Sequence, residues 1–487
     1  MLHRLTLLLV LTCLVASSSV RADPAAQRKP ANIIIILTDD QGYADLSCYG
    51  STRIKTPRVD RMAAEGMRFT DFYSASSVCT PSRAALMTGC YPIRVGMGEF
   101  PLLPNGKPWQ TRVLFRNAPF GLNPTETTIP KMLKSAGYAT ACIGKWHLGD
   151  QKPFLPTSHG FDYYFGLLYT PDMPPLDYVR GEKIVEEKID LSMTEQRYTE
   201  ESLKFIRDHK DGPFFLYFAH TYPHVPLAAS KQFRGTSARG LYGDAVEEID
   251  STVGRVLDEL KELHIDDNTL VVFTSDNGPW LTKGEDGGSA NPFRGGKGSS
   301  FEGGFRMPCV MRFPGTIPAG NVCHEMANQM DLLPTLAHFA GVTTIPQNID
   351  GKDITDLMLA KPGATTPHES FFYYVGNRLH AVRSGKWKLK VPTTLSEEYA
   401  GYVKLENPDT VIPHALYDLE NDPAEQKSVM ANYPDVAKRL QAMIESARED
   451  LGDSKRKMIG KNVRPVGRIP EVPGAVEHAG TGVGADQ

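Results

Sequence analysis

The sharpest local signal for chemistry is a cysteine at the start of a predicted helix. Residues 79–83 read Cys-Thr-Pro-Ser-Arg and lead into good helix formers that end in Thr-Gly. Pro81 suits the first turn of a helix and Gly89 suits its end, so Cys79 is predicted just before the helix N-terminus, where the dipole favours anionic character. Arg83 follows one turn later and can point back toward the thiol. A buried structural cysteine would need neither feature.

Two pairs of oxygen-bearing side chains indicate a site for a hard cation. Asp39 and Asp40 follow one apolar run, and Asp276 and Asn277 follow another. Carboxylate and amide oxygens suit Ca²⁺, with Mg²⁺ as the second choice, whereas Zn²⁺ would be expected to recruit histidine or cysteine. Acids at strand ends can also be solvated loop residues, but the shared placement of these four argues against that interpretation.

Lysines and histidines in Gly- or Pro-flanked runs extend the set. Lys145 and His147 lie in one Gly-flanked run, Lys297 lies in a second, and His220 and His224 follow a further apolar run. Imidazole titrates near neutrality, so His147 and His224 are candidate acid and base groups. His220 is interpreted as the structural histidine of its pair. A lone lysine is usually solvated, so both lysine assignments depend on the motifs around them.

Four continuous apolar runs are predicted to position these groups. They are residues 33–37, 138–143, 214–218 and 270–273, and each ends abruptly in polar side chains. Continuous runs are typical of parallel strands buried on both faces. Helical spacing over 246–260, and a shorter helix ended by Gly137, predict the helices that cover them. In such sheets the ligand site lies beyond the carboxyl ends of the strands, so one pocket is predicted there.

The cysteine run resembles the signature of the type I sulfatases, and six further segments resemble motifs of the arylsulfatase A-like branch of that family. In chain order they are Thr-Asp-Asp-Gln-Gly at 38–42, Gly-Lys-Trp-His-Leu-Gly at 144–149, Pro-His-Val-Pro at 223–226, Ser-Asp-Asn-Gly at 275–278, the Gly-rich segment at 294–304, and Leu-Tyr-Asp-Leu at 416–419. The match in order and spacing runs from about residue 30 to about residue 450, which chance does not explain.

The resemblance implies a modified nucleophile and a metal ion. Cys79 would be oxidised during export to Cα-formylglycine (3-oxoalanine) by a formylglycine-generating or sulfatase-maturing enzyme. One Ca²⁺ would be held by Asp39, Asp40, Asp276, Asn277 and residue 79. The implied fold is alkaline-phosphatase-like α/β: a large, mostly parallel sheet flanked by helices, with a smaller C-terminal α+β domain made of an antiparallel sheet and a helix.

The same resemblance implies roles for the remaining residues. Lys145, Lys297 and His224 would bind the sulfate, and the lysines would neutralise its charge. His224, with Lys297, would protonate the departing oxygen, and His147 would take the proton from the second hydroxyl of the hydrated aldehyde, which expels sulfate. Arg83, Cys79 and these two histidines form the expected catalytic set.

The predicted function is therefore an exported sulfatase that hydrolyses sulfate esters to an alcohol or phenol and inorganic sulfate. One alternative is a phosphomonoester or phosphonate hydrolase of the same superfamily, although an alkaline-phosphatase type would carry a serine or threonine nucleophile and two zinc ions. Another is a non-catalytic protein that binds sulfated glycans, which would require an unmodified Cys79. A cysteine-thiolate hydrolase would explain neither the acids nor the lysines. The natural substrate, a sulfated small molecule or glycan, stays open.

One segment departs from the family pattern. Relatives often read Gly-x-Pro-Tyr-Ser-Asn-Asp where residues 166–172 read Gly-Leu-Leu-Tyr-Thr-Pro-Asp. Thr170 keeps a hydroxyl, whereas Pro171 removes an amide donor, so the preference for the leaving group is expected to differ. Selectivity is otherwise assigned to the loops at 99–123 and 281–292.

Composition and the N-terminus bear on location. The chain has 487 residues, a formal net charge of −4, 41 % apolar and 23 % charged side chains, which indicates a globular protein and gives no electrostatic case for nucleic-acid binding. Residues 1–22 read as a signal peptide, with an apolar run too short to span a membrane. A secreted or periplasmic protein without a stable membrane anchor is predicted.

The predicted domain plan has a catalytic domain over 28–365, a C-terminal α+β subdomain over 366–450 and a flexible tail over 451–487. The C-terminal subdomain is predicted from apolar runs at 371–375, 380–383 and 387–391 and from a helix that begins at Pro434. Cys309 and Cys323 are close enough in sequence to pair, but the sequence cannot establish a disulfide.

Overall fold

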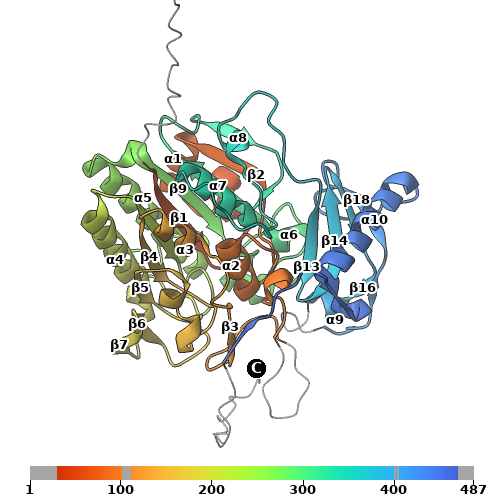
Figure 1. The fold of residues 1–487 in the computed structure, drawn as a ribbon, viewed down its shortest axis with the longest axis horizontal. Helices are drawn as coiled ribbons and strands as arrows, with labels where there is room; N and C mark the ends of the chain where they lie inside the picture. The colour runs from red at the N-terminus through yellow and green to blue at the C-terminus, as the bar shows by residue number, and fades with distance from the viewer. Residues whose placement is uncertain (1–29, 101–110, 400–401, 403–404, 470–487) are drawn as a thin grey trace, which may run out of the picture.

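A large sheet with helices on both faces forms the body of the molecule, and a smaller C-terminal domain lies beside it (Figure 1). The computed structural model describes residues 30–100, 111–399, 402 and 405–469. The predicted signal peptide lies outside these residues. Across the described ranges, no helix is long and apolar enough to cross a bilayer.

The four predicted strands form the centre of an 11-stranded sheet. They are β1 (Asn32–Thr38), β4 (Ala139–Gly144), β8 (Phe214–Ala219) and β9 (Thr269–Ser275). They pair in parallel in the order β9-β1-β8-β4, with Ile33 opposite both Phe215 and Leu270. Side chains along these strands are almost entirely buried, which explains why the sequence shows continuous rather than alternating apolar runs. The predicted fold class is confirmed.

Further strands, some parallel and some antiparallel to their neighbours, extend this parallel centre on both sides. One side carries β10 (Arg306–Arg312), β2 (Met67–Tyr73), β11 (Asn321–Cys323) and β12 (Ala327–Asn328), and the other carries β5 (Tyr163–Gly166), β6 (Asp177–Arg180) and β7 (Lys183–Glu187). β10 runs antiparallel to β9, and β6 runs antiparallel to β5. The sheet is therefore mixed, because β5 continues the parallel run beside β4 and antiparallel neighbours follow only at β10 and β6.

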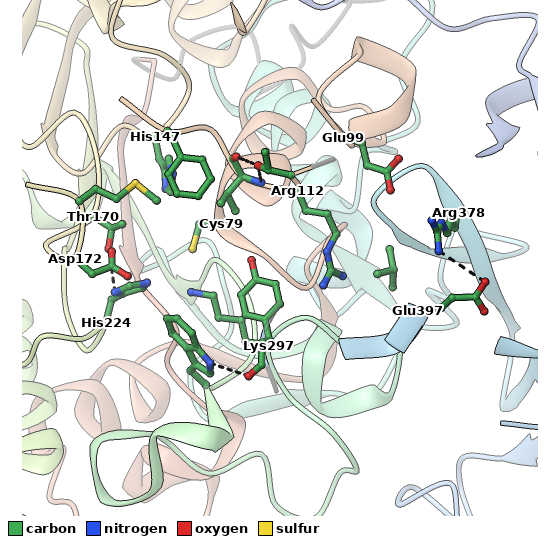
Figure 2. Close-up of a pocket in the computed structure, with 17 residues that line it drawn as sticks. Cys79, Glu99, Arg112, His147, Thr170, Asp172, His224, Lys297, Arg378 and Glu397 are labelled. Carbon is green, nitrogen blue, oxygen red and sulfur yellow. Dashed lines mark hydrogen bonds and ion pairs between the residues drawn. The ribbon is translucent and has the colours of Figure 1, made fainter. Parts of the chain in front are cut away.

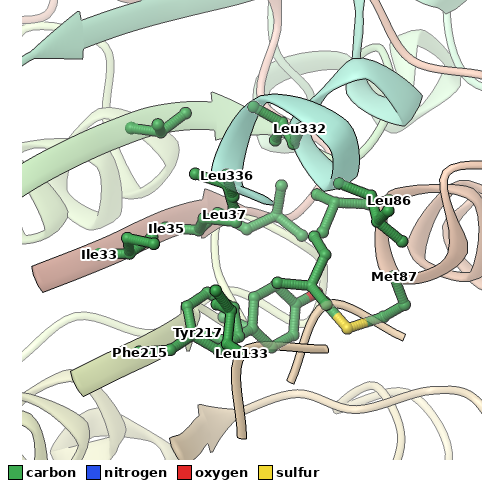
Figure 3. Close-up of a cluster of buried hydrophobic side chains, with 14 of the residues drawn as sticks. Ile33, Ile35, Leu37, Leu86, Met87, Leu133, Phe215, Tyr217, Leu332 and Leu336 are labelled. Carbon is green, nitrogen blue, oxygen red and sulfur yellow. The ribbon is translucent and has the colours of Figure 1, made fainter. Parts of the chain in front are cut away.

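The two faces of β1 pack against different sets of helices. Ile33, Ile35 and Leu37 pack on one side with α2 (Cys79–Thr88), α3 (Ile129–Ser135) and α7 (Leu332–Phe339), as Figure 3 shows. Ile34 and Ile36 pack on the other side with α1 (Pro57–Ala64), α4 (Thr194–His209) and α5 (Leu241–Glu262). Burial on both faces fixes the register of the strands and therefore the places where they end.

The C-terminal domain is built on an antiparallel sheet covered by one helix. Its strands are β13 (Phe371–Val375), β14 (Arg378–Ser384), β15 (Trp387–Lys390) and β18 (Ala415–Asp418), and α10 (Pro434–Leu451) buries Leu440, Ile444 and Ala447 in the same core. Short elements complete the fold: α6 (Glu302–Phe305), α8 (Thr355–Met358), β16 (Thr393–Thr394), α9 (Leu395–Tyr399) and β17 (Val411–Ile412).

Buried ion pairs join the C-terminal domain to the catalytic domain. Lys388 lies 3.0 Å from Glu302 and 2.9 Å from Glu425, and all three side chains are fully buried. Lys390 pairs with Glu398, and both reach Ser300, whose backbone N–H donates to Glu398 over 2.8 Å. The loop before α6 is therefore fixed by charged groups of the C-terminal domain.

The expectation of a flexible tail was wrong for residues 452–468. β19 (Gly452–Asp453) pairs with β20 (Met458–Ile459), and β21 (Gly467–Arg468) pairs with β3 (Phe120–Gly121) of the catalytic domain. Arg464 forms a paired contact with Glu126 at 2.8 Å. These contacts are long-range, so the polar, Gly- and Pro-rich sequence of the segment did not indicate them. The part of the expected tail from residue 470 lies outside the described residues.

Cys309 and Cys323 are free thiols on strands that are not neighbours. Cys309 of β10 and Cys323 of β11 both lie opposite Phe69, on the two sides of β2. Two strand spacings separate their Cα atoms by roughly 9–10 Å, which is more than a disulfide can bridge.

Replacement of Lys388 by methionine tests the domain junction. Lys388→Met leaves buried Glu425 without its cation and Glu302 with the more distant Arg306 at 3.6 Å, so the free energy of unfolding is expected to fall by about 3–5 kcal/mol. Chemical denaturation measures this change. Lys386→Met is the matched control, because Lys386 pairs with Asp418 at the surface and its loss is expected to change little. Equal effects of the two substitutions would contradict a junction held by Lys388.

Candidate active site

The carboxyl ends of the four central strands meet the N-terminus of α2 at one buried site. Asp39 and Asp40 follow β1, Asp276 and Asn277 follow β9, Lys145 and His147 follow β4, and His224 follows β8. Backbone hydrogen bonds fix the strand ends relative to one another, since Asp276 N–H donates to Thr38 and Lys145 N–H donates to Ala219. Cys79, the first residue of α2, lies close to Asp39 and Asp40, and Figure 2 shows it in one pocket with His147 and His224.

Three carboxylates form the centre of the site. Single ligand atoms of Asp39, Asp40, Cys79 and His224 all lie within 4.8 Å of one another. Cys79 Sγ is 3.5 Å from Asp39 Oδ1, and the Asp40 backbone N–H donates to Asp276 Oδ1 over 3.1 Å. Burial raises the pKa of Asp40, and burial together with the Asp39 carboxylate raises the pKa of Asp276. The charged forms therefore need compensation by cations.

Each carboxylate has a buried basic partner. Lys145 Nζ lies 2.5 Å from Asp39, Lys297 Nζ lies 2.7 Å from Asp40, and the Arg83 guanidinium lies 3.0 Å from Asp276. Arg83 also donates to the Lys145 carbonyl, so it links α2 to the ends of β9 and β4. The Lys297 side chain lies beside the Trp280 ring, with Nζ 4.5 Å from the ring centroid.

The oxygen set fits a hard divalent cation. Asn277 Oδ1 is buried and has no hydrogen-bond partner within the described part of the chain, while Asn277 Nδ2 donates to Asp40 Oδ1. An unsatisfied amide oxygen beside three carboxylates has the chemistry of a Ca²⁺ or Mg²⁺ site. Asp40 has a φ of 62°, an unfavourable backbone conformation that aims its carboxylate at this cluster.

Cys79 is buried rather than electronically activated. Burial raises the pKa of the Cys79 thiol well above its usual value, although Lys145 and Lys297 act in the opposite direction. Burial therefore opposes the anionic character expected from the helix start. This outcome disfavours a cysteine-thiolate hydrolase, because the thiolate is the nucleophilic form.

His147 is held as a neutral imidazole. Its Nε2 donates to the Leu114 carbonyl over 3.0 Å, and the Leu114 N–H in turn donates to Thr80 of α2. Burial, followed by the charge of Lys145, lowers the pKa of His147 well below its usual value. Nδ1 has no hydrogen-bond partner across the described ranges, so this nitrogen can accept a proton.

His224 lies on the opposite side of the site. Its Nδ1 contacts the Val225 carbonyl at 2.6 Å and Thr170 Oγ1 at 2.9 Å, and its Nε2 lies 3.5 Å from Asp40. Thr170, part of the segment that departs from the family pattern, therefore orients His224. His220 instead pairs with buried Glu195 at 2.5 Å and does not line the cavity.

A cavity of about 330 Å³ opens above Cys79, and sequence reasoning missed much of its lining. The loop at 99–123 contributes as expected, through Glu99, Arg112 and neighbouring residues, whereas the loop at 281–292 contributes none of the described lining residues. Asp172 and Trp280 lie next to predicted motifs, but the C-terminal domain supplies side chains that no motif indicated. These are Val375, Arg378, Glu397 and Tyr402.

Comparison with known proteins assigns the family. The model of the sulfatase family matches residues 31–342, and the model of the C-terminal region of aryl-sulfatases matches residues 366–469. The chain belongs to the sulfatase family. The resemblance inferred from the cysteine run and the strand-end motifs is therefore confirmed, and the protein is a sulfuric ester hydrolase.

Individual relatives match nearly the full length of this sulfatase. N-acetylgalactosamine-6-sulfatase of Rattus norvegicus is 38 % identical over 470 residues, covering 88 % of this chain and 87 % of the relative. Arylsulfatase A of Homo sapiens is 35 % identical over 442 residues, covering 83 % and 84 %. The crystal structure of Ps i-CgsB in complex with k-i-k-neocarrahexaose has a TM-score of 0.72 and 30 % identity, covering 86 % of this chain and 92 % of that one.

Substitution of Thr170 tests the orientation of His224. Thr170→Val removes the hydroxyl that contacts Nδ1, and loss of one hydrogen bond of about 0.5–1.5 kcal/mol predicts a drop in kcat/KM of a few-fold to about tenfold. Thr170→Ser keeps the hydroxyl and is expected to retain activity. Steady-state kinetics on an aryl sulfate measures both variants. Equal activity of the valine and serine variants would show that Thr170 does not position the imidazole.

Proposed function

We propose that residue 79 of this sulfatase acts as Cα-formylglycine and that the buried cluster around it binds and cleaves the sulfate ester. The single observation that carries this proposal is the position of Cys79 Sγ, beside the Asp39 carboxylate and at the base of the cavity. Sγ stands where the hydroxyls of a hydrated formylglycine would lie. Such a diol supplies one hydroxyl to attack sulfur and a second whose deprotonation expels sulfate.

Asp39, Asp40, Asp276 and Asn277 would hold Ca²⁺, with Mg²⁺ as the second choice. The bound cation supplies Lewis-acid stabilisation of charge on the sulfate oxygens. The all-oxygen donor set and the unpartnered Asn277 Oδ1 support this assignment. Arg83 keeps Asp276 in place through two contacts of 3.0 and 3.1 Å.

Lysines and histidines would divide the remaining work between binding and proton transfer. Lys145 and Lys297 each carry a buried ammonium toward the cluster, where they can donate to sulfate oxygens. His224, beside Lys297, would bind the sulfate and protonate the departing oxygen. His147, with Nδ1 unpartnered, would accept the proton of the second hydroxyl. Both imidazoles have a lowered pKa because of burial, so each starts as a neutral base.

For His224 to act as the acid, it must gain a proton before the leaving group departs. The departing alkoxide or phenoxide is far more basic than the imidazole, so proton transfer to it is favourable once the S–O bond lengthens. The adjacent Lys297 ammonium can donate to the same oxygen. The proton removed from the attacking hydroxyl can reach His224 Nε2 by way of the Asp40 carboxylate, which lies 3.5 Å from that nitrogen.

The predicted signal peptide and the proposed modification of residue 79 support export and maturation. A secreted or periplasmic protein would meet a formylglycine-generating or sulfatase-maturing enzyme on its way out of the cell. The substrate class is a sulfated small molecule or a sulfated glycan. Glycan hydrolysis is supported by the oligosaccharide named for the Ps i-CgsB complex and by the size of the cavity.

A phosphate or phosphonate ester shares the tetrahedral shape of a sulfate ester and is the second candidate substrate. Matched aryl sulfate and aryl phosphate distinguish the two, since the proposal expects a much higher kcat/KM for the sulfate. A protein that binds sulfated glycans without turnover would hydrolyse neither compound and would retain the thiol at residue 79.

The modification is tested by the mass of the tryptic peptide that spans residues 69–83. In protein made by a host competent for formylglycine formation, this peptide is expected to lose sulfur and two hydrogens and to gain one oxygen. An intact thiol, in a host shown to convert another sulfatase, would contradict the mechanism.

Metal binding is tested by thermal unfolding with and without Ca²⁺. At a free Ca²⁺ concentration of about 100 times Kd the native state gains about 2.7 kcal/mol, which raises Tm. Asp40→Asn is expected to abolish this shift. Asp45→Asn is the matched control: Asp45 is a buried carboxylate that accepts hydrogen bonds from Gly42 and Tyr242, so its loss lowers Tm but keeps the Ca²⁺ shift. A full shift in Asp40→Asn would refute the ligand assignment.

A further inference from the structure

The cavity is larger than a sulfate group and extends away from Cys79 toward the C-terminal domain. Figure 2 shows Arg112 between Cys79 and a far end formed by Glu99, Arg378 and Glu397. The reaction centre occupies only the inner end. The outer end therefore contacts the part of the substrate that bears the sulfate ester.

Arg378 at the outer end carries a weakly compensated positive charge. It begins β14, and its closest carboxylate oxygen, Glu397 Oε1, lies 3.7 Å away. The other oxygen of Glu397 is already engaged by Lys455 at 2.7 Å and by the Thr394 N–H at 2.8 Å. The Arg378 side chain is 34 % exposed, so its donors are accessible from the cavity.

Arg112 places a second, rigid positive charge nearer to Cys79. Its guanidinium donates to the Gly298 carbonyl over 2.9 Å and lies 5.0 Å from the centre of the Tyr402 ring. This arrangement fixes the plane of the guanidinium in the wall of the cavity. A guanidinium held in one orientation is well suited to a planar or tetrahedral anion.

Glu99 reduces rather than cancels this positive character. It packs against the turn between β13 and β14, where a Cβ on Gly376 would lie 2.1 Å from Glu99 Oε1. Its Oε2 is buried without a hydrogen-bond partner across the described ranges, and burial raises the pKa of Glu99. A carboxyl group in this state carries less negative charge at mildly acidic pH than an exposed one.

We propose that Arg378 and Arg112 form a second anion subsite, which selects sulfated glycans that carry another anionic group near the sulfate ester to be cleaved. A carboxylate of a uronic acid and a second sulfate share the required chemistry. This inference rests on the proposed function, because it places the reacting sulfate at residue 79. Arg378 is a specificity-determining residue and takes no part in bond cleavage.

Kinetics on matched substrates tests the subsite. The substrates are p-nitrophenyl sulfate, a neutral monosulfated disaccharide, and two disaccharides that add either a uronate carboxylate or a second sulfate. Arg378→Gln is expected to lower kcat/KM on the doubly anionic substrates by roughly tenfold or more. Activity on p-nitrophenyl sulfate is expected to stay unchanged. Arg255→Gln, on the outer face of α5, removes the same charge far from the cavity and is expected to have no effect.

The results on these substrates and variants distinguish failure of the subsite proposal from failure of the proposed function. Equal kcat/KM for neutral and doubly anionic disaccharides, or an equal loss on every substrate in Arg378→Gln, would overturn the subsite. Absence of turnover on all four compounds would refute the proposed function. In that case calorimetric binding to the Cys79→Ala protein decides, since the subsite still requires tighter binding of the doubly anionic disaccharides and loss of that preference in Arg378→Gln. A preference for only one of the two doubly anionic disaccharides would identify the subsite's anion as a carboxylate or a sulfate.

Discussion

The structure depends on keeping three carboxylates buried within contact distance of one another. Asp39, Asp40 and Asp276 repel each other and are cut off from water, so the native state is stable only if each has a cation beside it. Arg83, Lys145 and Lys297 supply three positive charges from three separate parts of the chain. A site with this balance is suited both to the proposed divalent cation and to an anionic ester.

The sheet makes such a cluster possible, but two residues that follow its strands adopt strained backbone conformations. Parallel neighbours β9, β1, β8 and β4 end side by side, so short segments after each strand meet without long loops. Asp40 and His147 both adopt φ values of 62°, a conformation that costs of order 1–3 kcal/mol for a residue other than glycine. The buried packing of β1 and of α2 holds the segments in place against this strain.

Much of the fold and of the inner site could be predicted from the sequence because local sequence patterns indicate both. Strand burial appears as continuous apolar runs, and the reactive side chains directly follow them. Arg378 and Glu397 carry no such signal, because they lie about 280 residues after Glu99 and Arg112 in the chain. They reach the cavity only because the C-terminal domain docks through contacts such as that of Lys388 with Glu302. The ordered strands after residue 451 were missed for the same reason.

The buried position of Cys79 restricts when this residue could be modified. All ten residues of α2 are buried, so the modification proposed for Cys79 would require an enzyme to reach this segment before the helix packs. The loop that carries Lys297 is anchored by Lys390 and Glu398, which are synthesised some 300 residues after Cys79. The site therefore stays incomplete until the C-terminal domain has been synthesised. If Cys79 is modified as proposed, this order along the chain would leave the cysteine accessible while the C-terminal domain is made.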